Sequence, residues 1–443
     1  MQVIGIALAI SVLVIGASLY ILACIKYPPT LLLAVVAYSM ISKSASVVYL
    51  EAVPTYIIEV ALASRDINAS MRHILYNLFI FSSALAIISL LVKRGSRVVC
   101  ARKRLFGTRE MDSELRLAII VVSILLGIQI VNALLSPPYA LPGMSINRQQ
   151  FWANIRSPLV ADLIGVLVIF VPAISGASLG YAKVTGNRAF RSYSIRLILA
   201  YCFYFLITGA RFNGSLLALL FWLAPYWSIL WMFGKSPKLQ RMGLVVSIAI
   251  LLFLFVGYLE IADRGISQMA GSTWNGFLYR IFALQGDVYF TADLKAQEGH
   301  RASIALLTQG MERTIMEYMP AQLAQSYIHK GVNLAGSLPG NSILVFGFWI
   351  GILPMIAYSI ILGLAAGMYG YFIVTGRFIL LIPSSYICLW TYSGYTQGSF
   401  SIFMDYKFPI ALIIIVLWLL LPKARPSRIP ASTRRQAIGE GRG

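Results

Sequence analysis

Long apolar runs, each about as long as a bilayer is thick, recur along most of this chain. A helix that crosses the hydrocarbon core needs about 20 predominantly apolar residues. The pattern predicts an all-α, polytopic transmembrane bundle of about eleven spans, within a range of ten to twelve. The expected spans are 3–25, 30–50, 71–92, 117–136, 158–181, 195–210, 215–234, 242–262, 342–370, 376–397 and 406–421.

One long hydrophilic interruption divides these runs. It covers residues 263–341 and is far longer than an ordinary connection between helices. The chain is therefore expected to contain an N-terminal bundle of about eight spans over residues 1–262, this large loop, and C-terminal spans over 342–421. A basic tail follows over 422–443 and is expected to be disordered.

The large loop carries its own pattern of apolar positions. After an aromatic segment and a polar patch (293–301), apolar residues recur at steps of three and four, which predicts one amphipathic helix over about 303–329. Such a helix is expected on the membrane surface or on the tops of the spans. Its apolar face would consist of Ile304, Leu307, Met311, Ile315, Met319 and Leu323.

The basic residues predict how the spans are oriented. The connections 93–116, 182–196 and 235–241 and the tail 422–443 are rich in Lys and Arg and agree on one register. The positive-inside rule places them in the cytoplasm, and the same register places the loop 263–341 on the outer face. The net charge of +20 is therefore interpreted as a topology signal, and no nucleic-acid partner is expected.

Composition and missing motifs narrow the function classes. Hydrophobic residues make up 59% of the chain and charged residues only 12%, about half the share found in soluble domains. None of the four cysteines lies in the large loop, so no disulfide framework is expected. The sequence contains no Walker A loop, zinc motif or pair of aspartates at D-x-D spacing, so neither a cofactor nor a metal is expected.

Arginines are frequent on the expected outer face, where the positive-inside rule should deplete them. Because the guanidinium fork suits phosphate, their number indicates an anionic ligand. The alternative for each is pairing with lipid headgroups or with nearby acids. The strongest candidates are Arg211, in a tight turn between two spans, and Arg280, in an aromatic stretch. The set comprises Arg65, Arg148, Arg156, Arg211, Arg264, Arg280, Arg301 and Arg313.

Three other positions could carry chemistry. Lys43 lies deep in the second expected span, where charge is costly and often functional. A structural pair with Glu51, or snorkelling toward the outer surface, is the alternative. In the loop, His300 and Glu298 are candidates for a general base that accepts a proton from a substrate hydroxyl. Plain surface polarity is their alternative.

Two short segments resemble a known family. One is Thr-Gly-Ala-Arg over 208–211, followed by Gly214 and a leucine-rich span. The other is the loop exit, Leu-Pro-Gly over 338–340, leading to Phe-Gly over 346–347 and Ile-Gly over 350–351. Together with the plan of many spans and one large outer loop, they resemble the bacterial O-antigen or polysaccharide repeat-unit polymerases of the Wzy type and the related O-antigen ligases.

The resemblance implies a GT-C-like, metal-independent membrane glycosyltransferase in the bacterial inner (plasma) membrane, with a cytoplasmic C-terminus. Its substrates would be undecaprenyl-diphosphate-linked oligosaccharides, polymerised at the periplasmic face into O-antigen or a related surface polysaccharide, a part of lipopolysaccharide biosynthesis. Its partners would be membrane lipid, a chain-length regulator and a flippase. Family arginines engage the lipid diphosphate, and this role falls on Arg211, then Arg280, with Arg301 as a third candidate.

Other functions remain open at this point. An O-antigen ligase shares the plan and the arginines but uses a lipid A core acceptor. A flippase or transporter of lipid-linked oligosaccharides would fit the membrane domain, although such proteins often show mirrored halves. A purely structural membrane protein would have no reason to concentrate arginines outside.

Overall fold

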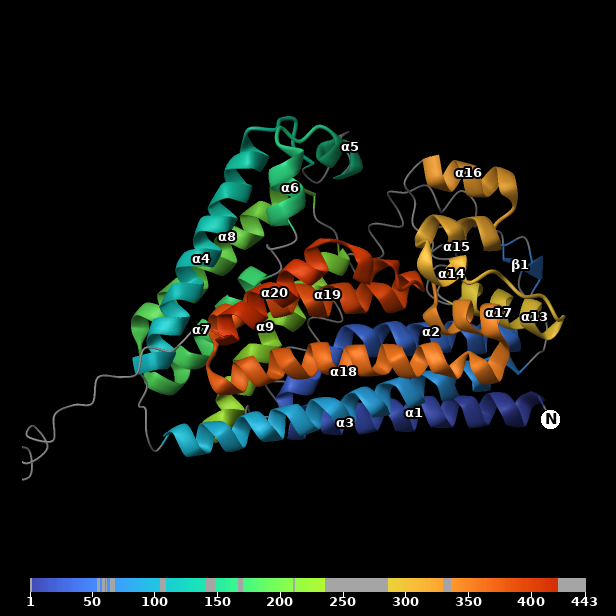
Figure 1. The fold of residues 1–443 in the computed structure, drawn as a ribbon, viewed down its shortest axis with the longest axis horizontal. Helices are drawn as coiled ribbons and strands as arrows, with labels where there is room; N and C mark the ends of the chain where they lie inside the picture. Colours follow the sequence, from blue (N-terminus) through green and yellow to red (C-terminus); the bar gives the residue numbers. More distant parts are fainter. Residues whose placement is uncertain are drawn as a thin grey trace, which may run out of the picture.

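Long apolar helices dominate the computed structural model of this protein (Figure 1). The described residues are 2–53, 56–57, 60, 62–63, 68–103, 109–140, 148–165, 170–209, 212–235, 286–329 and 336–420. Within them, six helical segments are long and apolar enough to cross a membrane, so the chain is a multi-pass helical membrane protein. They lie in α1 (Gln2–Lys26), η1 (Pro28–Leu33) with α2 (Ala34–Ala52), α3 (Ala69–Lys103), α4 (Arg109–Leu134), α8 (Arg188–Ile207) and α18 (Ile352–Thr375).

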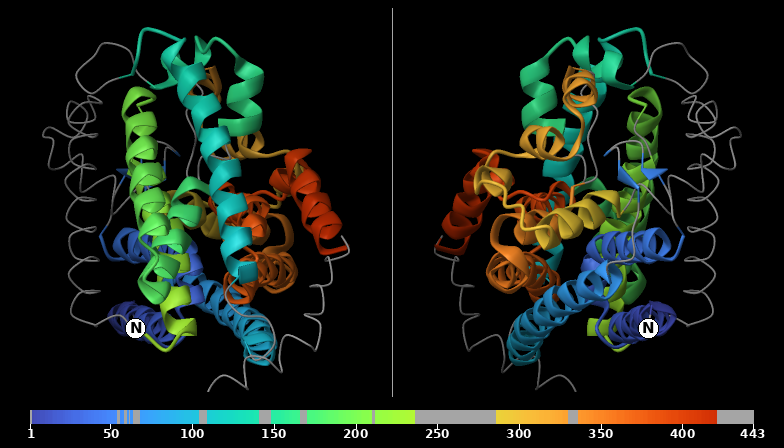
Figure 2. Two further views of the ribbon diagram at one scale, coloured as in Figure 1. Left: turned by 90° about the vertical axis from the view of Figure 1, so that its left-hand side faces the viewer. Right: turned by 90° about the vertical axis from the view of Figure 1, so that its right-hand side faces the viewer.

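Shorter helices complete the bundle. They are α5 (Arg148–Ala153), α6 (Pro158–Gly165), α7 (Phe170–Thr185), α9 (Phe212–Met232), α17 (Leu338–Ile350), η3 (Phe378–Leu380), α19 (Leu381–Gln397), η4 (Ser401–Met404) and α20 (Lys407–Leu420). The strands β1 (Tyr56–Ile57) and β2 (Leu62–Ala63) form a small antiparallel ribbon. The expected span 242–262 lies outside the described residues. Helices α1, α3 and α18 run nearly parallel, whereas α4 and α8 are inclined to them (Figure 2).

Close packing of α18 against α3 depends on two glycines. A Cβ on Gly363 would lie 2.8 Å from the Cβ of Ile87, and one on Gly367 would lie 2.6 Å from Cδ1 of Leu91. The sequence predicts close helix packing from this small-x-x-x-small spacing, and these contacts confirm it.

A second glycine pair ends a helix instead. The expected span 342–370 is wrong as one continuous helix, because the structure divides it into α17 and α18. Gly347 has φ of 75° and ψ of 177°, a conformation that is open to glycine and strained for other residues. Gly351 then separates the two helices as the last cap of one and the first of the next.

The amphipathic helix expected over 303–329 is also wrong as a single element. The structure has α14 (Ala305–Thr308), α15 (Met311–Tyr318) and α16 (Ala321–His329) in its place. Gly310, with φ of 86°, and Pro320 interrupt the chain, because a left-handed residue and a missing N–H both stop a helix.

The predicted apolar face of this segment is confirmed in part. Leu307, Ile315 and Met319 are buried in the hydrophobic core, whereas the side chain of Ile304 is 60% exposed.

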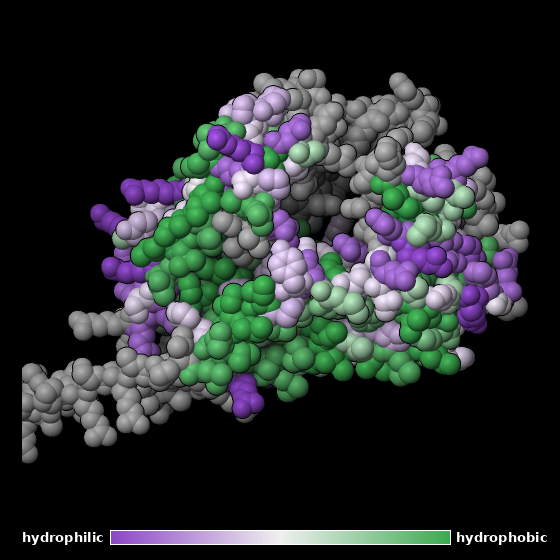
Figure 3. All heavy atoms as spheres, turned by 45° about the horizontal axis from the view of Figure 1, so that its top comes forward, coloured by the Kyte–Doolittle hydropathy of each residue, from purple (hydrophilic) through white to green (hydrophobic). Residues whose placement is uncertain are grey.

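The basic connections meet at one end of the bundle. Lys235 Nζ donates to the carbonyl of Lys183 at 3.2 Å, and a Cβ on Gly376 would lie 2.8 Å from the Met111 side chain. Because these contacts join connections between different helices, we name this the basic end. At the opposite end lie α14–α17, and Figure 3 shows hydrophilic side chains at both ends with hydrophobic surface between them.

This arrangement generates a test of membrane topology. Alkaline phosphatase fused after residue 300 should be active, because that position is expected outside, where the enzyme folds and forms its disulfides. The same enzyme fused after residue 100, at the basic end, should be inactive. Activity is read in colonies with matched expression measured by immunoblot, and the reverse pattern would overturn the orientation.

Candidate functional site

The first described helix of the expected outer loop is buried in the bundle. Helix α13 (Asp287–Gln297) packs against α17, α2 and α3, and its residues 287–294 are all buried. Gly286 precedes it and donates its backbone N–H to Ser46 Oγ at 2.9 Å. A Cβ on Gly286 would lie 2.8 Å from the backbone nitrogen of Val47, so the glycine allows α13 to approach α2 closely.

Lys43 of α2 holds the beginning of α13. Its side chain is buried, its ammonium donates to the carbonyl of Gly336, and it lies 5.4 Å from the centre of the Tyr395 ring. The acidic group that interacts with it electrostatically is Asp287, the first residue of α13. A charge at this depth is stable only when it is paired and hydrogen-bonded, and the loop supplies both kinds of partner.

Glu51 has a different role from the one expected beside Lys43. Its Oε2 accepts the backbone N–H of Ser70 at 2.9 Å, in the first turn of α3. A carboxylate at this position satisfies an orphan N–H and complements the positive end of the helix dipole.

Arg72 of α3 holds the second half of α13. Its Nε and Nη2 donate to the two carboxylate oxygens of Asp293 at 2.9 and 2.6 Å, a bidentate fork. Gln297 donates its side-chain amide to the same carboxylate at 2.7 Å. The Asp293 side chain is 2% exposed and that of Arg72 is 25% exposed, so most of this pair is shielded from water. Such charge-assisted, two-point contacts fix orientation as well as distance.

A polar layer lies beneath these two ion pairs. His73 is fully buried, with Nδ1 at 3.0 Å from Ser44 Oγ, and its ring centre is 4.2 Å from that of Tyr289 on α13. Asn77 contacts the imidazole and accepts the hydroxyl of Tyr395 at 2.7 Å. Burial raises the pKa of Tyr289 well above its ordinary value, so the phenol stays neutral. The layer therefore joins α2, α3, α13 and α19.

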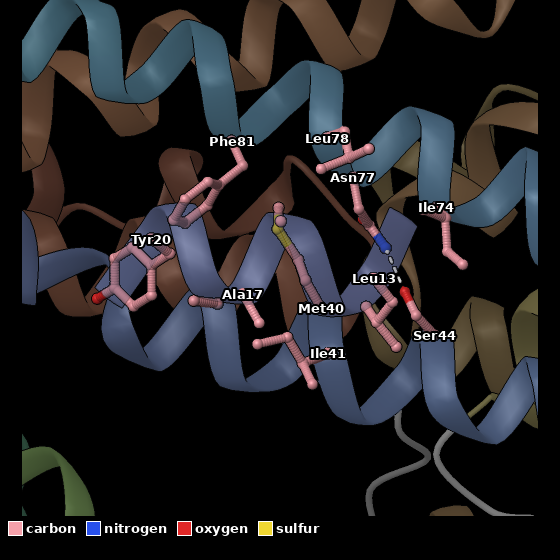
Figure 4. Close-up of a pocket in the computed structure, with 12 residues that line it drawn as sticks. Leu13, Ala17, Tyr20, Met40, Ile41, Ser44, Ile74, Asn77, Leu78 and Phe81 are labelled. Carbon is pink, nitrogen blue, oxygen red and sulfur yellow. Dashed lines mark hydrogen bonds between the residues drawn. The ribbon is translucent and has the colours of Figure 1, made fainter. Parts of the chain in front are cut away.

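An apolar groove lies on the other side of this layer, between α1, α2 and α3 (Figure 4). Ser44 and Asn77 form its polar wall and are hydrogen-bonded at 3.3 Å. Its cavity of about 50 Å³ is much smaller than ligand pockets, which enclose roughly 300–1,000 Å³. We interpret it as a packing gap between spans.

The expected general base lies just beyond the last residue of α13. His300 is exposed, and its Nε2 is 3.2 Å from Oε1 of Glu317 on α15. Arg313 Nη2 lies 3.8 Å from the other oxygen of Glu317. The sequence places Glu298 beside His300, but the carboxylate that contacts the imidazole is Glu317, and Glu298 is an exposed residue of the turn after α13.

Arg301, an expected diphosphate ligand, braces this turn. Its Nη1 donates to the carbonyls of Ala296 and His300, both at 2.8 Å. Its guanidinium also packs on the glycine kink of α17, because a Cβ on Gly347 would lie 3.0 Å from Nη2. Arg301 thus stabilises the turn that carries His300, and its exposed side chain still presents N–H groups to solvent.

The other two expected diphosphate ligands, Arg211 and Arg280, lie outside the described residues. The turn that leads to Arg211 is described up to Gly209, which has φ of +60°. A Cβ on Gly209 would lie 2.7 Å from the Cβ of Ala140, so this turn packs tightly against the segment after α4.

Asn341 of α17 fixes α15 to the bundle. Its side-chain oxygen accepts the hydroxyl of Tyr318 at 3.0 Å, and its amide nitrogen donates to Thr314 Oγ1 at 3.3 Å and to the carbonyl of Gly398 at 2.7 Å. The asparagine is fully buried and links α15, α17 and the end of α19. Glu317 and Arg313 are therefore carried on an anchored helix.

The site now has a clear chemical character. An imidazole is oriented by a carboxylate, which is itself paired with a guanidinium, an arrangement suited to general base chemistry. Within the described ranges, no group of three or more His, Cys, Asp and Glu side chains is placed to hold a metal ion. The sequence signal that would have found Arg72 and His73 is their position at the start of an apolar run, where charge is costly.

Comparison with known proteins gives one match. Residues 306–412 are similar to the model of DUF6418, a family of unknown function. That segment begins in α14, ends within α20 and includes Glu317, Arg313 and Asn341. Neither the curated proteins nor the solved structures gave a match to the chain.

The ion pair between α3 and α13 can be tested by a double-mutant cycle. Asp293→Leu leaves Arg72 without its carboxylate in a mostly buried position, and we expect it to cost about 3 kcal/mol of stability. Adding Arg72→Met should recover part of that loss, because both charges are then gone. Thermal unfolding in detergent measures both variants, with the exposed Glu312→Leu as control. Equal melting temperatures for wild type and Asp293→Leu would contradict a docking role.

Proposed function

We propose that this protein is a metal-independent membrane glycosyltransferase of the O-antigen polymerase type. It joins undecaprenyl-diphosphate-linked oligosaccharide repeat units into a surface polysaccharide at the periplasmic face of the bacterial inner membrane. The observation that carries the proposal is the contact of His300 with Glu317, and of Glu317 with Arg313, at the end of the bundle opposite the basic connections.

The proposal includes a finer topology than the six long helices. With about eleven spans, the basic end faces the cytoplasm, and α13–α17 face the periplasm in a GT-C-like plan. The gathering of the basic connections at one end supports this register, since connections on the same side of a membrane must meet there.

The reaction follows from the groups present. The acceptor hydroxyl gives its proton to His300 while its oxygen bonds to the anomeric carbon of the donor. The bond from that carbon to the diphosphate oxygen breaks, and the lipid diphosphate leaves with the electron pair. Glu317 orients the imidazole at 3.2 Å and stabilises it once it is protonated.

Arginines supply the second requirement, stabilisation of the charge on the leaving diphosphate. Arg211 and Arg280 hold this role in the resemblance, and Arg313 is the arginine found nearest the His300 cluster. Because guanidinium groups neutralise phosphate by two-point hydrogen bonds, they can act where no metal ligand set is expected.

The structure weakens one support of the transporter alternative. A transporter interpretation drew on Lys43 as a charge deep in a span. Lys43 is engaged by Gly336, Tyr395 and Asp287, partners that dock the loop on the bundle. A ligase would share the His300 chemistry and differ in its acceptor, so an assay of product must separate the two.

Deletion of the gene in its host and complementation with variants tests the proposal. The deletion should collapse the polysaccharide ladder to core plus one repeat unit, and wild type should restore it. His300→Ala should fail to restore long chains, because loss of a general base lowers the rate by roughly 10²–10⁴. Glu312→Gln, an exposed acid on α15, is the matched control and should restore the ladder.

Other patterns have defined meanings. Lipid-linked polymer that accumulates without reaching the core would identify a ligase. An unchanged ladder in the deletion would overturn the proposal, and a full ladder with His300→Ala would remove His300 from the mechanism.

A further inference from the structure

The chain folds back on itself after α19. Gly398 has φ of +73°, and η4 then returns along α19, so that a Cβ on Gly394 would lie 3.3 Å from Ile402. This return places Asp405, Tyr406 and Lys407 beside the middle of α19 and next to α6.

A charged and hydroxylated group forms where α20 meets α6. Lys407 Nζ pairs with Oδ1 of Asp162, and the hydroxyl of Tyr406 donates to Oδ2 at 3.1 Å. The side chain of Asp162 is 56% exposed, so its oxygens remain open to a further donor. Tyr406 is 53% exposed and presents its ring to the surface.

Two aromatic side chains of α19 lie behind this group. The rings of Tyr386 and Trp390 are 5.1 Å apart and tilted by 41°. Tyr386 is only 4% exposed, and its hydroxyl is within electrostatic range of Asp405, Asp162 and Tyr406. Among the described residues, neither the Tyr386 hydroxyl nor the Trp390 indole N–H has a hydrogen-bond partner of good geometry. Buried donors without partners are rare and point to a ligand acceptor.

The chemistry of this cluster selects its ligand. Aromatic rings, a phenol, an indole and two carboxylates match a sugar ring, which has an apolar face and hydroxyls that both donate and accept. A phosphate fits less well, because the single cation Lys407 faces two acids, Asp162 and Asp405. The surface is hollowed between the part that carries α6 and the part that carries α14–α16, which leaves room on this side (Figure 3).

We propose that Asp162, Tyr386, Trp390 and Tyr406 form a saccharide-binding subsite of this protein. It is separate from the His300 cluster, and it rests on the proposed function for the source of its sugar. It holds a sugar of a lipid-linked substrate by hydrogen bonds and ring packing and contributes no proton transfer. Tyr386 and Asp162 are its main hydrogen-bonding groups.

Direct binding tests this subsite independently of catalysis. The probe is the repeat oligosaccharide released by mild acid from the host's surface polysaccharide, titrated calorimetrically into the full chain in lipid nanodiscs. Tyr386→Phe, which removes one neutral hydrogen bond, should weaken binding about fivefold, and Asp162→Asn about tenfold or more. Met404→Ala, at an exposed residue of η4, is the control and should bind as wild type does.

The outcomes separate the two proposals. Saccharide binding that depends on Tyr386 and Asp162 supports the subsite even if the deletion ladder is unchanged. Equal binding by all variants, or no binding by wild type, overturns it whatever the ladder shows. Binding of phosphatidylglycerol that is lost in Lys407→Gln, without saccharide binding, would instead identify a lipid headgroup contact and also overturn it. In a polymerisation assay, Tyr386→Phe should raise KM at unchanged kcat, whereas His300→Ala should lower kcat.

Discussion

Two buried ion pairs fix the architecture of the α13 end. Asp287 and Asp293 enter the bundle on one short helix, and burial of a carboxylate is costly unless a cation meets it. Lys43 on α2 and Arg72 on α3 supply those cations from two neighbouring spans. Since neither the loop helix nor the cationic spans can be buried alone at low cost, each requires the other. The interaction specifies where α13 sits, because only one placement pairs both acids.

The rest of the candidate site depends on that placement. The turn after α13 carries His300 and is braced by Arg301, which contacts the glycine kink of α17. Asn341 anchors α15, which brings Glu317 to the imidazole. An exposed catalytic group on a rigid base combines access for a large substrate with a fixed orientation. The loop is thus better understood as an extension of the bundle core than as a cover over it.

The sequence predicts the spans well because lipid imposes one strong constraint, length in apolar residues. It also predicts the buried positions Leu307, Ile315 and Met319 from their spacing. The burial of α13 could not be predicted in this way, because its acids find partners 221 residues away in the case of Arg72 and Asp293. The breaks at Gly310 and Pro320 were readable in the sequence, and the periodic pattern outweighed them.

Polymerisation of lipid-linked sugars needs two saccharides in one molecule, and the two polar clusters differ in the way that this requires. The His300 cluster combines a base with a guanidinium, which suits the place where a bond breaks and charge develops. The cluster around Tyr386 combines aromatic rings with carboxylates, which suits a sugar that is held and not cleaved. An acidic cluster would repel a second diphosphate, so its charge itself favours one saccharide over the charged carrier that bears it. The division of charge between the two clusters therefore gives a physical basis for distinguishing the reacting end of a substrate from the rest of its glycan.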